Sequence, residues 1–580
     1  MSVIVKQAIT EIRMAIMDAA GRAVADGVFP EAPLGDFVIE VPANRANGDY
    51  SSNAAMAWAR DLHKAPREIA SLLVERLVLA DTFADRCEIA GPGFLNFYLS
   101  DSFNACVIED ILEKGGDYGR SDYGSGKRIN VEFVSANPTG PMHMGNARGG
   151  ALGDCLAAVL DFAGYDVERE FYVNDAGNQI AKFGLSLDVR YRQLFLGENA
   201  VELPEDSYHG DDIIERAKEF AEIHGDSYLN EPEDVRRKAL IDFALPENIK
   251  LMKANMDKYR IVYDTWFLES TLHNDGELAE TIGILKDKGL TYEKDGALWY
   301  KNREVLAARL KNEGKSDKDI EKLELKDEVL IRQNGNPTYF AADIAYHRNK
   351  FKRGFDKAID VWGADHHGHV ARMKGALDAV GYDGNRLDVV LMQLVNLTKD
   401  GEVVRMSKRS GKSITLSDLL DEIPIDAVRF LFNIREPGSQ MEFDLGLAVS
   451  QNSENPVYYC QYAHARICSI FRKLEEEGRA YSKPQFADIM LLKESEEKEL
   501  IKHLSAFTDQ IVVSAKNYDP ARITRYAVDL ATLFHKFYNA CRVNCDDEAL
   551  RNARLSLCLC VKTVLANILN MFKITVPEKM

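Results

Sequence analysis

The sequence has no Cys-x-x-Cys pair, although nine cysteines are spread over its 580 residues. Zinc ribbons need closely spaced cysteine pairs, and small disulfide frameworks need many cysteines in a short chain. The sequence therefore predicts neither kind of site, and it predicts no metal held by dedicated protein ligands. Unpaired cysteines are typical of a reducing compartment, so we expect a cytoplasmic protein.

Uncharged apolar runs long enough to span a membrane are also absent from the sequence. The first thirty residues carry charges throughout, from Lys6 to Arg22. Such a distribution is typical of an amphipathic helix and not of a secretory signal. We therefore expect no membrane partner.

A positive net charge is lacking as well, because 72 Lys and Arg stand against 91 Asp and Glu, which gives −19. Binding to phosphates needs basic side chains, so indiscriminate binding of nucleic acid is disfavoured and DNA is not an expected partner. The balance is uneven, since residues 456–580 hold 18 basic and 15 acidic side chains. An RNA-binding surface, if there is one, belongs on this C-terminal segment or on local patches.

A strand, a tight turn and a helix are predicted over residues 129–160. A β-branched apolar run ends near Val134, turn-forming residues follow, and leucines recur on one helical face from Leu152. The group His143-Met144-Gly145-Asn146 stands where the helix begins. A helix start offers free backbone N–H groups and the positive end of the helix dipole, and its glycine lets a ligand approach, so this turn suits a triphosphate.

This tetrapeptide is not specific by itself, since a similar group, His366-His367-Gly368-His369, occurs later in the chain. Only the earlier group lies at the first strand-to-helix turn of an α/β region. It also has a downstream partner, Arg405-Met406-Ser407-Lys408-Arg409-Ser410-Gly411-Lys412. Such a cationic loop is suited to fold over bound phosphates and to supply charge as pyrophosphate leaves.

The ordered pair resembles the two nucleotide-binding motifs of class I aminoacyl-tRNA synthetases, here in the forms His-Met-Gly-Asn and Arg-Met-Ser-Lys. Further stretches resemble the arginyl-tRNA synthetase family, and the match covers nearly the whole chain. These stretches are residues 48–53, 91–97, 132–146, 327–369, 455–466, 534–543 and 577–580. The resemblance implies ATP-dependent ligation of L-arginine to tRNA(Arg) through an arginyl-adenylate, with release of AMP and pyrophosphate.

The fold expected is multidomain α/β, because 580 residues exceed what one hydrophobic core can organise. An N-terminal α+β domain is predicted over residues 1–115, and a class I Rossmann-like catalytic domain over residues 116–420. One insertion is predicted at about residues 185–299, after which apolar segments, including residues 338–346, are expected to resume the sheet. A connecting helical segment should follow over residues 421–455, and an α-helical bundle, the anticodon-binding domain of the resemblance, over residues 456–580.

A guanidinium substrate needs carboxylates in planar hydrogen-bonded geometry, beside an aromatic or hydroxyl wall that excludes lysine. Glu132 lies on the strand before the first motif, and Asp343 follows Tyr339 by four residues. By residue type alone, helix capping or surface ion pairing is the commoner role for such acids. The resemblance places Glu132, Tyr339 and Asp343 at the guanidinium. It places Ser135, Asn137 and His366 near the α-amino and carboxylate groups.

The resemblance also implies that ATP binds between the two motifs, with His143 and Lys408 as catalytic residues and Mg²⁺ entering with the nucleotide. The implied ATP-binding residues are His143, Gly145, Asn146, Met406, Ser407 and Lys408. Asn146 stands where the general class I motif has His, so it can bond to phosphate or ribose but cannot carry charge. Some family members replace the second-motif lysine by one just before the first motif. This chain has Gly140 there and keeps Lys408.

Contacts with tRNA are expected from two regions. In the polar loop around Tyr50 and Asn53, the resemblance implies a ring and an amide that touch the tRNA D-loop corner. Tyr526 and Tyr538 are expected as exposed aromatics that bind the anticodon stem and loop. A self-stabilised turn and core packing are the structural alternatives for these residues. The expected partners are thus tRNA(Arg), L-arginine and ATP, and the chain is expected to act as a monomer.

Three other functions fit parts of the sequence. A class I synthetase for glutamate, glutamine or cysteine would share the fold, but a cysteine enzyme should show metal ligands and a glutamate pocket should show basic residues at positions 132 and 343. An inactive RNA-binding paralogue would not need His143, Ser407 and Lys408. A small nucleotidyltransferase with a His-x-Gly motif would not need the helical region after residue 420.

Overall fold

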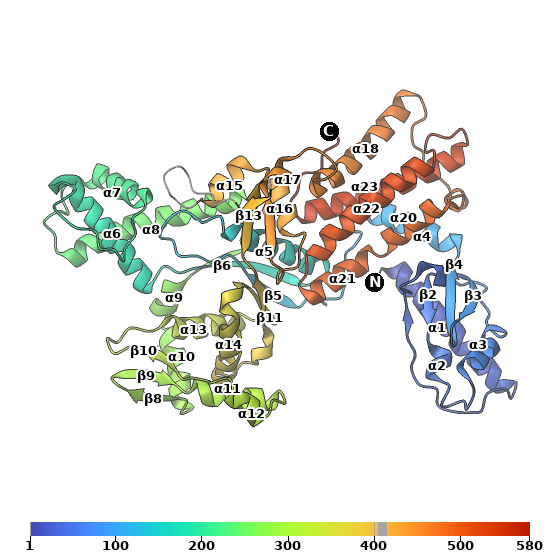
Figure 1. Cartoon of the computed structure of the whole chain (residues 1–580), viewed down its shortest axis with the longest axis horizontal. Coiled ribbons are helices and arrows are strands. Elements are labelled where there is room, and N and C mark those ends of the chain that lie inside the picture. The colour runs from blue at the N-terminus through green and yellow to red at the C-terminus, as the bar shows by residue number, and fades with distance from the viewer. Residues whose placement is uncertain (1, 400, 404–413) are drawn as a thin grey trace.

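The computed structural model describes residues 2–399, 401–403 and 414–580. The molecule is elongated: an N-terminal module lies at one side, a parallel sheet at the centre and a helical arm at the opposite end (Figure 1). A helical bundle formed by the C-terminal part of the chain lies between the sheet and the N-terminal module. This arrangement confirms the predicted multidomain α/β fold.

The N-terminal module is an antiparallel sheet packed against helices. Its strands lie in the order β1-β2-β4-β3, and they are β1 (Ile39–Glu40), β2 (Tyr50–Ser52), β3 (Ala84–Ala90) and β4 (Phe94–Leu99). The helices are α1 (Val3–Ala25), α2 (Ala54–Ala57), α3 (Pro66–Val74) and α4 (Asp101–Lys114). Trp58 and Phe97 are fully buried in its core. The predicted α+β character is confirmed, and β3 and β4 form an antiparallel pair.

The central sheet contains parallel strands in the order β12-β11-β5-β6-β7. They are β5 (Arg128–Glu132), β6 (Asp166–Val173), β7 (Thr265–Leu268), β11 (Lys357–Gly363) and β12 (Leu387–Met392). Its first helix is α5 (Asn146–Phe162), and α13 (Tyr339–Lys352) and α14 (His367–Val380) belong to its second half. The two halves meet between β5 and β11. Ligands of such folds bind outside the carboxyl ends of the strands at this switch point.

Close packing of α5 on the sheet depends on glycine. A Cβ atom added at Gly153 would lie 2.1 Å from the ring of Phe133, the residue that follows β5. At Gly150 an added Cβ would lie 2.9 Å from Ile261. Helix α5 therefore lies directly on its neighbours, and its first turn reaches the carboxyl end of β5.

Two insertions interrupt the sheet, where the sequence predicted one. The first, between β6 and β7, is an arm of three helices: α6 (Gly177–Leu196), α7 (Asp211–His224) and α8 (Glu233–Lys258). The second, after β7, has the antiparallel order β10-β9-β8. Its elements are α9 (Glu269–Asn274), α10 (Glu277–Asp287), β8 (Thr291–Lys294), β9 (Ala297–Tyr300), α11 (Asn302–Asn312), α12 (Asp317–Glu321) and β10 (Glu328–Ile331). The single insertion at about residues 185–299 is therefore wrong, because β7 belongs to the central sheet.

Residues 338–346 begin helix α13 and do not form the predicted strand. Thr338 caps the helix by accepting a hydrogen bond from the Ala341 N–H. Phe340, Ile344 and Phe351 are buried at helical spacing. A short apolar run fits both periods, and packing decides between them. Asp343 consequently lies one helical turn after Tyr339, on the same face.

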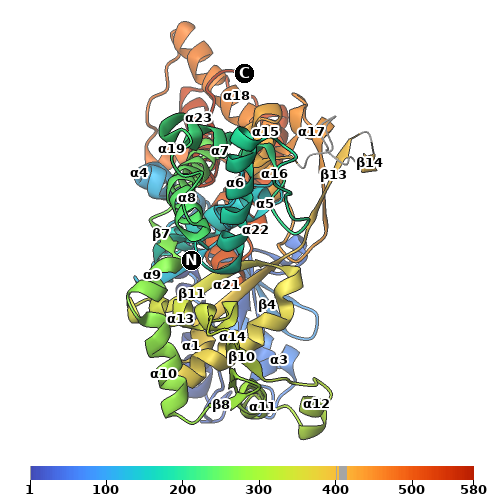
Figure 2. The same cartoon turned by 90° about the vertical axis from the view of Figure 1, so that its left-hand side faces the viewer.

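A third sheet, in the order β14-β13-β15, lies beyond β12. It contains β13 (Val395–Lys399), β14 (Glu402–Val403) and β15 (Met441–Asp444). Helices α15 (Leu416–Glu422), α16 (Ile425–Phe432) and α17 (Leu445–Val449) lie near it (Figure 2). The segment predicted as helical over residues 421–455 thus includes a strand, because β15 pairs with β13.

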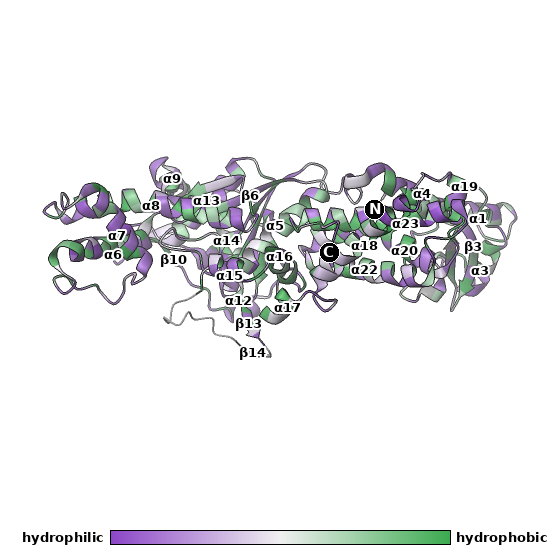
Figure 3. Cartoon of the chain, turned by 90° about the horizontal axis from the view of Figure 1, so that it is seen from above, coloured by the Kyte–Doolittle hydropathy of each residue, from purple (hydrophilic) through white to green (hydrophobic). Residues whose placement is uncertain are grey.

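The C-terminal part is an all-helical bundle, as predicted. Its helices are α18 (Pro456–Glu476), α19 (Phe486–Ile489), α20 (Ser495–Ser505), α21 (Phe507–Asn517), α22 (Ala521–Ala540) and α23 (Glu548–Met571). They carry apolar and polar residues together, as expected for amphipathic bundle helices (Figure 3). Helix α23 is long and apolar enough to cross a membrane, but 72% of that stretch is buried inside the protein. It is therefore a core helix of the bundle.

A buried ion cluster joins the bundle to the central domain. The Asp154 carboxylate on α5 accepts hydrogen bonds from Arg429 of α16 (2.5 Å), Arg169 of β6 (2.9 Å) and Lys573, which follows α23 (3.1 Å). Arg429 also donates to the backbone oxygens of Tyr259 and Phe572. One carboxylate thus ties three distant segments to the helix that begins at the first motif.

Candidate active site

A cavity of about 560 Å³ opens at the switch point, outside the carboxyl ends of β5 and β11. Helix α13 supplies one wall and the start of α14 another. Six of its polar residues are Glu132, Ser135, Tyr339, Asp343, His366 and His369. Five of these were predicted from the sequence to contact the substrate, and the fold brings them together from segments more than 200 residues apart.

Glu132, the last residue of β5, has a partner on each carboxylate oxygen. Ser135 Oγ donates to Oε1 (2.8 Å), and Lys350 Nζ donates to Oε2 (2.5 Å). The Ser135 hydroxyl also accepts the Tyr172 N–H (3.1 Å). Val134 and Ser135 have φ angles of 73° and 40°, a left-handed conformation that is costly for a β-branched residue such as valine. Such strain is typical of functional sites, and here it accompanies the return of Ser135 toward Glu132.

Asp343 and Tyr339 face the cavity from the first two turns of α13. The Asp343 carboxylate is about one-third exposed and accepts a hydrogen bond from His369 Nε2 (3.1 Å). Tyr339 is 41% exposed. An accessible carboxylate beside an accessible ring, with Glu132 at the base, is the geometry that a guanidinium needs.

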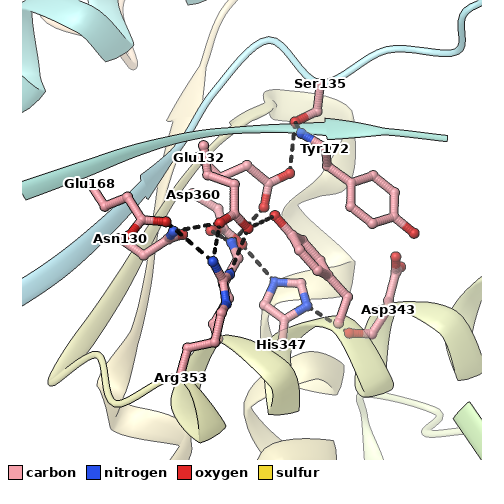
Figure 4. Close-up of polar contacts among 12 residues, drawn as sticks. Asn130, Glu132, Ser135, Glu168, Tyr172, Asp343, His347, Arg353 and Asp360 are labelled. Atoms are coloured by element: carbon pink, nitrogen blue, oxygen red, sulfur yellow. Dashed lines mark hydrogen bonds and ion pairs between the residues drawn. The ribbon is translucent and has the colours of Figure 1, made fainter. Parts of the chain in front are cut away.

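Behind these residues lies a fully buried charge network. Lys350 Nζ bridges Glu132 and Asp360 Oδ1 (2.8 Å), and His347 Nε2 contacts Asp360 Oδ2 (2.7 Å). The other nitrogen of His347 faces the backbone oxygen of Asp343 (2.7 Å). Figure 4 shows Glu132 and Asp360 side by side, with His347 approaching them from α13. Because both nitrogens of His347 face acceptors, this geometry favours the doubly protonated imidazolium.

The charges in this network shift one another's pKa values. Burial alone would raise the pKa of Asp360, but Lys350 and His347 together lower it to about 2. Burial alone would lower the pKa of His347, but Asp360 raises it above its ordinary value. Burial raises the pKa of Glu132, and Lys350 opposes that rise. These opposed effects show that burial here is tolerated only because each charge has an opposite partner.

The network continues on the other side of β5. Glu170, which is fully buried on β6, accepts hydrogen bonds from Tyr346 Oη (2.5 Å) and Asn130 Nδ2 (3.1 Å) and pairs with Arg353 (2.6 Å). Glu168 pairs with the same arginine (3.2 Å). Glu168 and Glu170 thus share one cation, Arg353, which is distinct from Lys350.

The first motif lies where the sequence placed it, at the start of α5. The His143 ring accepts the Gly145 N–H through Nδ1 (2.9 Å), Gly145 caps the helix and Asn146 is its first residue. Residues 142–144 pair with residues 414–416: Met144 N–H donates to the Ile414 oxygen, and Leu416 N–H to the Met142 oxygen. The chain that follows the second motif is therefore bonded directly to the first. Met406, Ser407 and Lys408 themselves lie outside the described residues.

His366 and Asn137, which were also predicted to contact the substrate, lie at different distances from the cavity lining: one is part of it and the other is not. His366 lines the cavity and its side chain is 60% exposed. Asn137 lies two residues beyond Ser135 in the connection after β5, and it is not among the described residues that line the cavity. His366 therefore lines the same cavity as Glu132 and Asp343, whereas Asn137 does not.

The structure contradicts part of the predicted tRNA surface. Tyr526 is buried, because its ring stacks on His503 (4.1 Å) and its hydroxyl donates to the His503 backbone oxygen. Tyr50 is buried beside a cavity between the N-terminal module and α20, and burial raises its pKa. Neither is the exposed ring expected from the sequence. Asn53 accepts the Val38 N–H, the role of a structural turn residue, whereas Tyr538 is half-buried with the Arg466 guanidinium 4.4 Å from its ring centre.

Sequence reasoning missed the network behind the pocket. Asp343, His347 and Lys350 recur at positions i, i+4 and i+7, which is one face of a helix. That signal was hidden because residues 338–346 were predicted as a strand. Glu132, His347 and Asp360 are also close enough to suggest a metal site, but the Lys350 ammonium lies on both carboxylates.

Models of three known protein families match successive parts of the chain. The arginyl tRNA synthetase N terminal domain matches residues 5–99, and the class I (R) tRNA synthetase catalytic domain matches residues 107–441. The DALR anticodon binding domain matches residues 460–580. These matches follow the three parts of the fold in order.

Curated relatives match along the whole chain. An arginine--tRNA ligase of Caldanaerobacter subterraneus subsp. tengcongensis is 54% identical over 578 residues, 100% of both chains. One of Ruminiclostridium cellulolyticum is 51% identical over 571 residues, 98% of both. The fold also resembles the Thermus thermophilus arginyl-tRNA synthetase, with a TM-score of 0.69 at 22% identity over 98% of this chain and 100% of that one.

Proposed function

This chain belongs to the arginyl-tRNA synthetase family, and from that premise we propose that the cavity at the switch point binds the guanidinium group of arginine. The chain uses ATP to ligate L-arginine to tRNA, through the arginyl-adenylate that is general for class I enzymes. The observation that carries the proposal is the pairing of Glu132 and Asp343 across one cavity, with Tyr339 at its wall.

The assignment of the pocket follows from charge and shape. The carboxylates of Glu132 and Asp343 offer acceptors to a planar group with five N–H donors, whereas a lysine ammonium has only three donors around one point. Ser135, Asn137 and His366 are proposed to hold the α-amino and carboxylate groups. Arginine would then lie with its carboxylate toward the first motif.

The chemistry needs no nucleophile from the protein. The arginine carboxylate attacks the α-phosphorus of ATP in line, so the protein positions the reactants and neutralises charge. His143 and the backbone N–H groups at the start of α5, with Gly145 and Asn146, are proposed to hold the phosphates. Met406, Ser407 and Lys408 are proposed to act on the departing pyrophosphate, and Mg²⁺ to enter as part of the nucleotide substrate.

The anticodon loop is proposed to bind an aromatic surface of the bundle that does not include Tyr526. Tyr458 and Tyr462 on α18 are stacked (6.4 Å between ring centres), and Tyr462 also stacks on His535 of α22 (6.0 Å). Tyr462 is 39% exposed, and Arg466 covers the Tyr538 ring. Stacked rings beside an arginine are suited to single-stranded RNA. Under this proposal residues 456–580 bind the anticodon, and residues 1–115 meet the D-loop corner by a surface that excludes Tyr50.

We further propose that the enzyme acts in the cytoplasm as a monomer, without a membrane or DNA partner. Its net charge of −19 supports the exclusion of indiscriminate nucleic acid binding. Sedimentation of the purified protein at several concentrations tests the monomer, and a concentration-dependent mass would contradict it.

The exchange of pyrophosphate into ATP, measured with each of the twenty amino acids and with and without total tRNA, tests the function. We expect exchange with arginine only, because the other side chains cannot satisfy two carboxylates at the base of the pocket. Exchange with another amino acid would keep the fold and reject the pocket. Exchange with none under either condition would favour an RNA-binding protein without synthetase activity.

A further inference from the structure

We propose that Lys350 is the internal counter-ion of the arginine pocket: it positions Glu132 and keeps it charged, so that Glu132 can receive the substrate guanidinium. This inference rests on the proposed function of the pocket. Lys350 does not face the substrate, and it acts through Glu132, so it is a positioning residue.

The proposal rests on the contacts that the buried Lys350 ammonium makes with two carboxylates, those of Glu132 and Asp360. The Lys350 side chain is completely buried, and its Nζ lies 2.5 Å from Glu132 Oε2 and 2.8 Å from Asp360 Oδ1. The Tyr346 ring covers it at 4.6 Å. Glu132, the last residue of β5, lies opposite Asp360 in the neighbouring strand β11, so a single ammonium bridges the two halves of the sheet at the switch point.

The pocket carboxylates differ in their partners. Glu132 and Asp360 both contact Lys350, Asp360 also contacts His347, and Glu170 shares Arg353 with Glu168. The Asp343 carboxylate is about one-third exposed and contacts His369. A guanidinium that enters the cavity brings a positive charge to Asp343, and it meets a Glu132 that is already oriented by Lys350 and Ser135.

Besides Ser135, which donates to Oε1, the titratable groups near Glu132 in the described part of the chain come from four segments. From α13 these are Tyr346, His347 and Lys350, and from β11 Asp360; from β6 they are Glu170 and Tyr172, and Tyr263 lies beside them. Among these described groups Lys350 and His347 are the cations, and His347 contacts Asp360 instead of Glu132. Without Lys350, burial and the nearby Asp360 would both favour the protonated form of Glu132.

The test is the variant Lys350→Met, which keeps an unbranched side chain, one atom shorter, and removes its charge. We expect the KM for arginine in ATP–pyrophosphate exchange at pH 7 to rise at least about tenfold, the scale of one charge-assisted hydrogen bond. The KM for ATP should change by less than about twofold, since the first motif is not touched. The matched control is Lys352→Met, on the same helix, where the lysine pairs with Glu277 at the surface and the KM should not change.

The pH dependence separates this role from a general loss of structure. In the variant, Glu132 is protonated at neutral pH and regains its charge as the pH rises. The KM for arginine should therefore fall as the pH is raised above neutrality, because burial raises the pKa of Glu132 and Lys350 no longer opposes that rise. The unmodified enzyme should show no such fall. A rise in KM that is independent of pH and equal for arginine and ATP would overturn the proposal.

Two more variants complete the test. If Lys350 acts through Glu132, the double variant Glu132→Gln, Lys350→Met should have the arginine KM of Glu132→Gln alone. An unchanged KM in Lys350→Met beside a raised KM in Glu132→Gln would reject the counter-ion and keep the pocket, whereas unchanged values in both would reject the pocket as well. If Lys350→Met does not fold, Lys350→Gln replaces it, because it keeps a hydrogen-bond donor and also removes the charge. The proposal then predicts the same fall in the KM for arginine with rising pH, and a KM that does not change with pH would overturn it.

Discussion

At the scale of single residues, the carboxylates of Glu132 and Asp343 have different roles in the pocket. Glu132 has protein partners on both oxygens, whereas Asp343 is accessible and contacts His369. A carboxylate already satisfied by the protein contributes orientation, and one left open contributes binding energy when the substrate arrives. We therefore expect Asp343 to provide more of the affinity for arginine.

The substitution Asp343→Asn tests this expectation, because it preserves shape and removes charge. The KM for arginine should rise about tenfold to a hundredfold, the effect of losing a hydrogen bond to a charged group. Steady-state exchange kinetics at varied arginine concentration measure it. Asp365→Asn, at the exposed rim of the same cavity, is the control, and equal effects of the two changes would contradict the assignment.

At the scale of elements, the sequence specified the segments whose signals are local. The turn at His143 combined a strand, turn residues and a helix start, and the structure has all three. The bundle was predictable because its helices are long and strongly periodic. In helix α22, for example, Ile523, Ala527, Leu530 and Phe534 recur at helical spacing and are all buried.

Elements defined by partners from elsewhere in the chain could not be predicted. Strand β7 has four residues and looks like part of an insertion until β6 is seen beside it. Strand β15 is equally short and is fixed by its pairing with β13. The helical spacing of Lys350 from Asp343 and His347 could not show its role, because that role depends on Glu132 and Asp360, residues of two strands brought together by the sheet.

The stacked rings of α18 and α22 give a prediction for tRNA. Replacing Tyr462 by Ala should raise the KM for tRNA about fivefold to a hundredfold and leave the KM for arginine unchanged, since one base–aromatic stack contributes about 1–3 kcal/mol. Aminoacylation at varied tRNA concentration measures both constants. Tyr526→Phe, a change to a buried ring, should leave the KM for tRNA unchanged; an effect on tRNA there but not at Tyr462 would contradict the assigned surface.

At the scale of the whole molecule, Asp154 is the point where the parts are joined. Burial alone would raise the pKa of Asp154, but Arg429, Lys573 and Arg169 together lower it below its ordinary value. The stabilisation is therefore complete above the ordinary pKa near 3.8 and is lost as the pH falls through the lower pKa of the folded state.

The substitution Asp154→Asn should lower the free energy of unfolding by about 3–5 kcal/mol at pH 7, because it leaves buried cations without their partner. The difference from the unmodified protein should shrink below about pH 4. Thermal unfolding followed by calorimetry at several pH values measures this effect. Asp161→Asn, on the exposed face of the same helix beside Arg120, is the control and should change the free energy of unfolding by less than about 1 kcal/mol. Equal losses of stability in the two variants would contradict the proposal that Asp154 joins the domains.

The same cluster bears on how the chain is made. Asp154 and Lys573 are separated by 419 positions, so a ribosome must add most of the polypeptide before the helix at the first motif gains its last ionic partner. Vectorial synthesis usually lets an early domain finish folding first. We therefore expect the complete ion cluster around Asp154 to form late in translation, after Lys573 has been added.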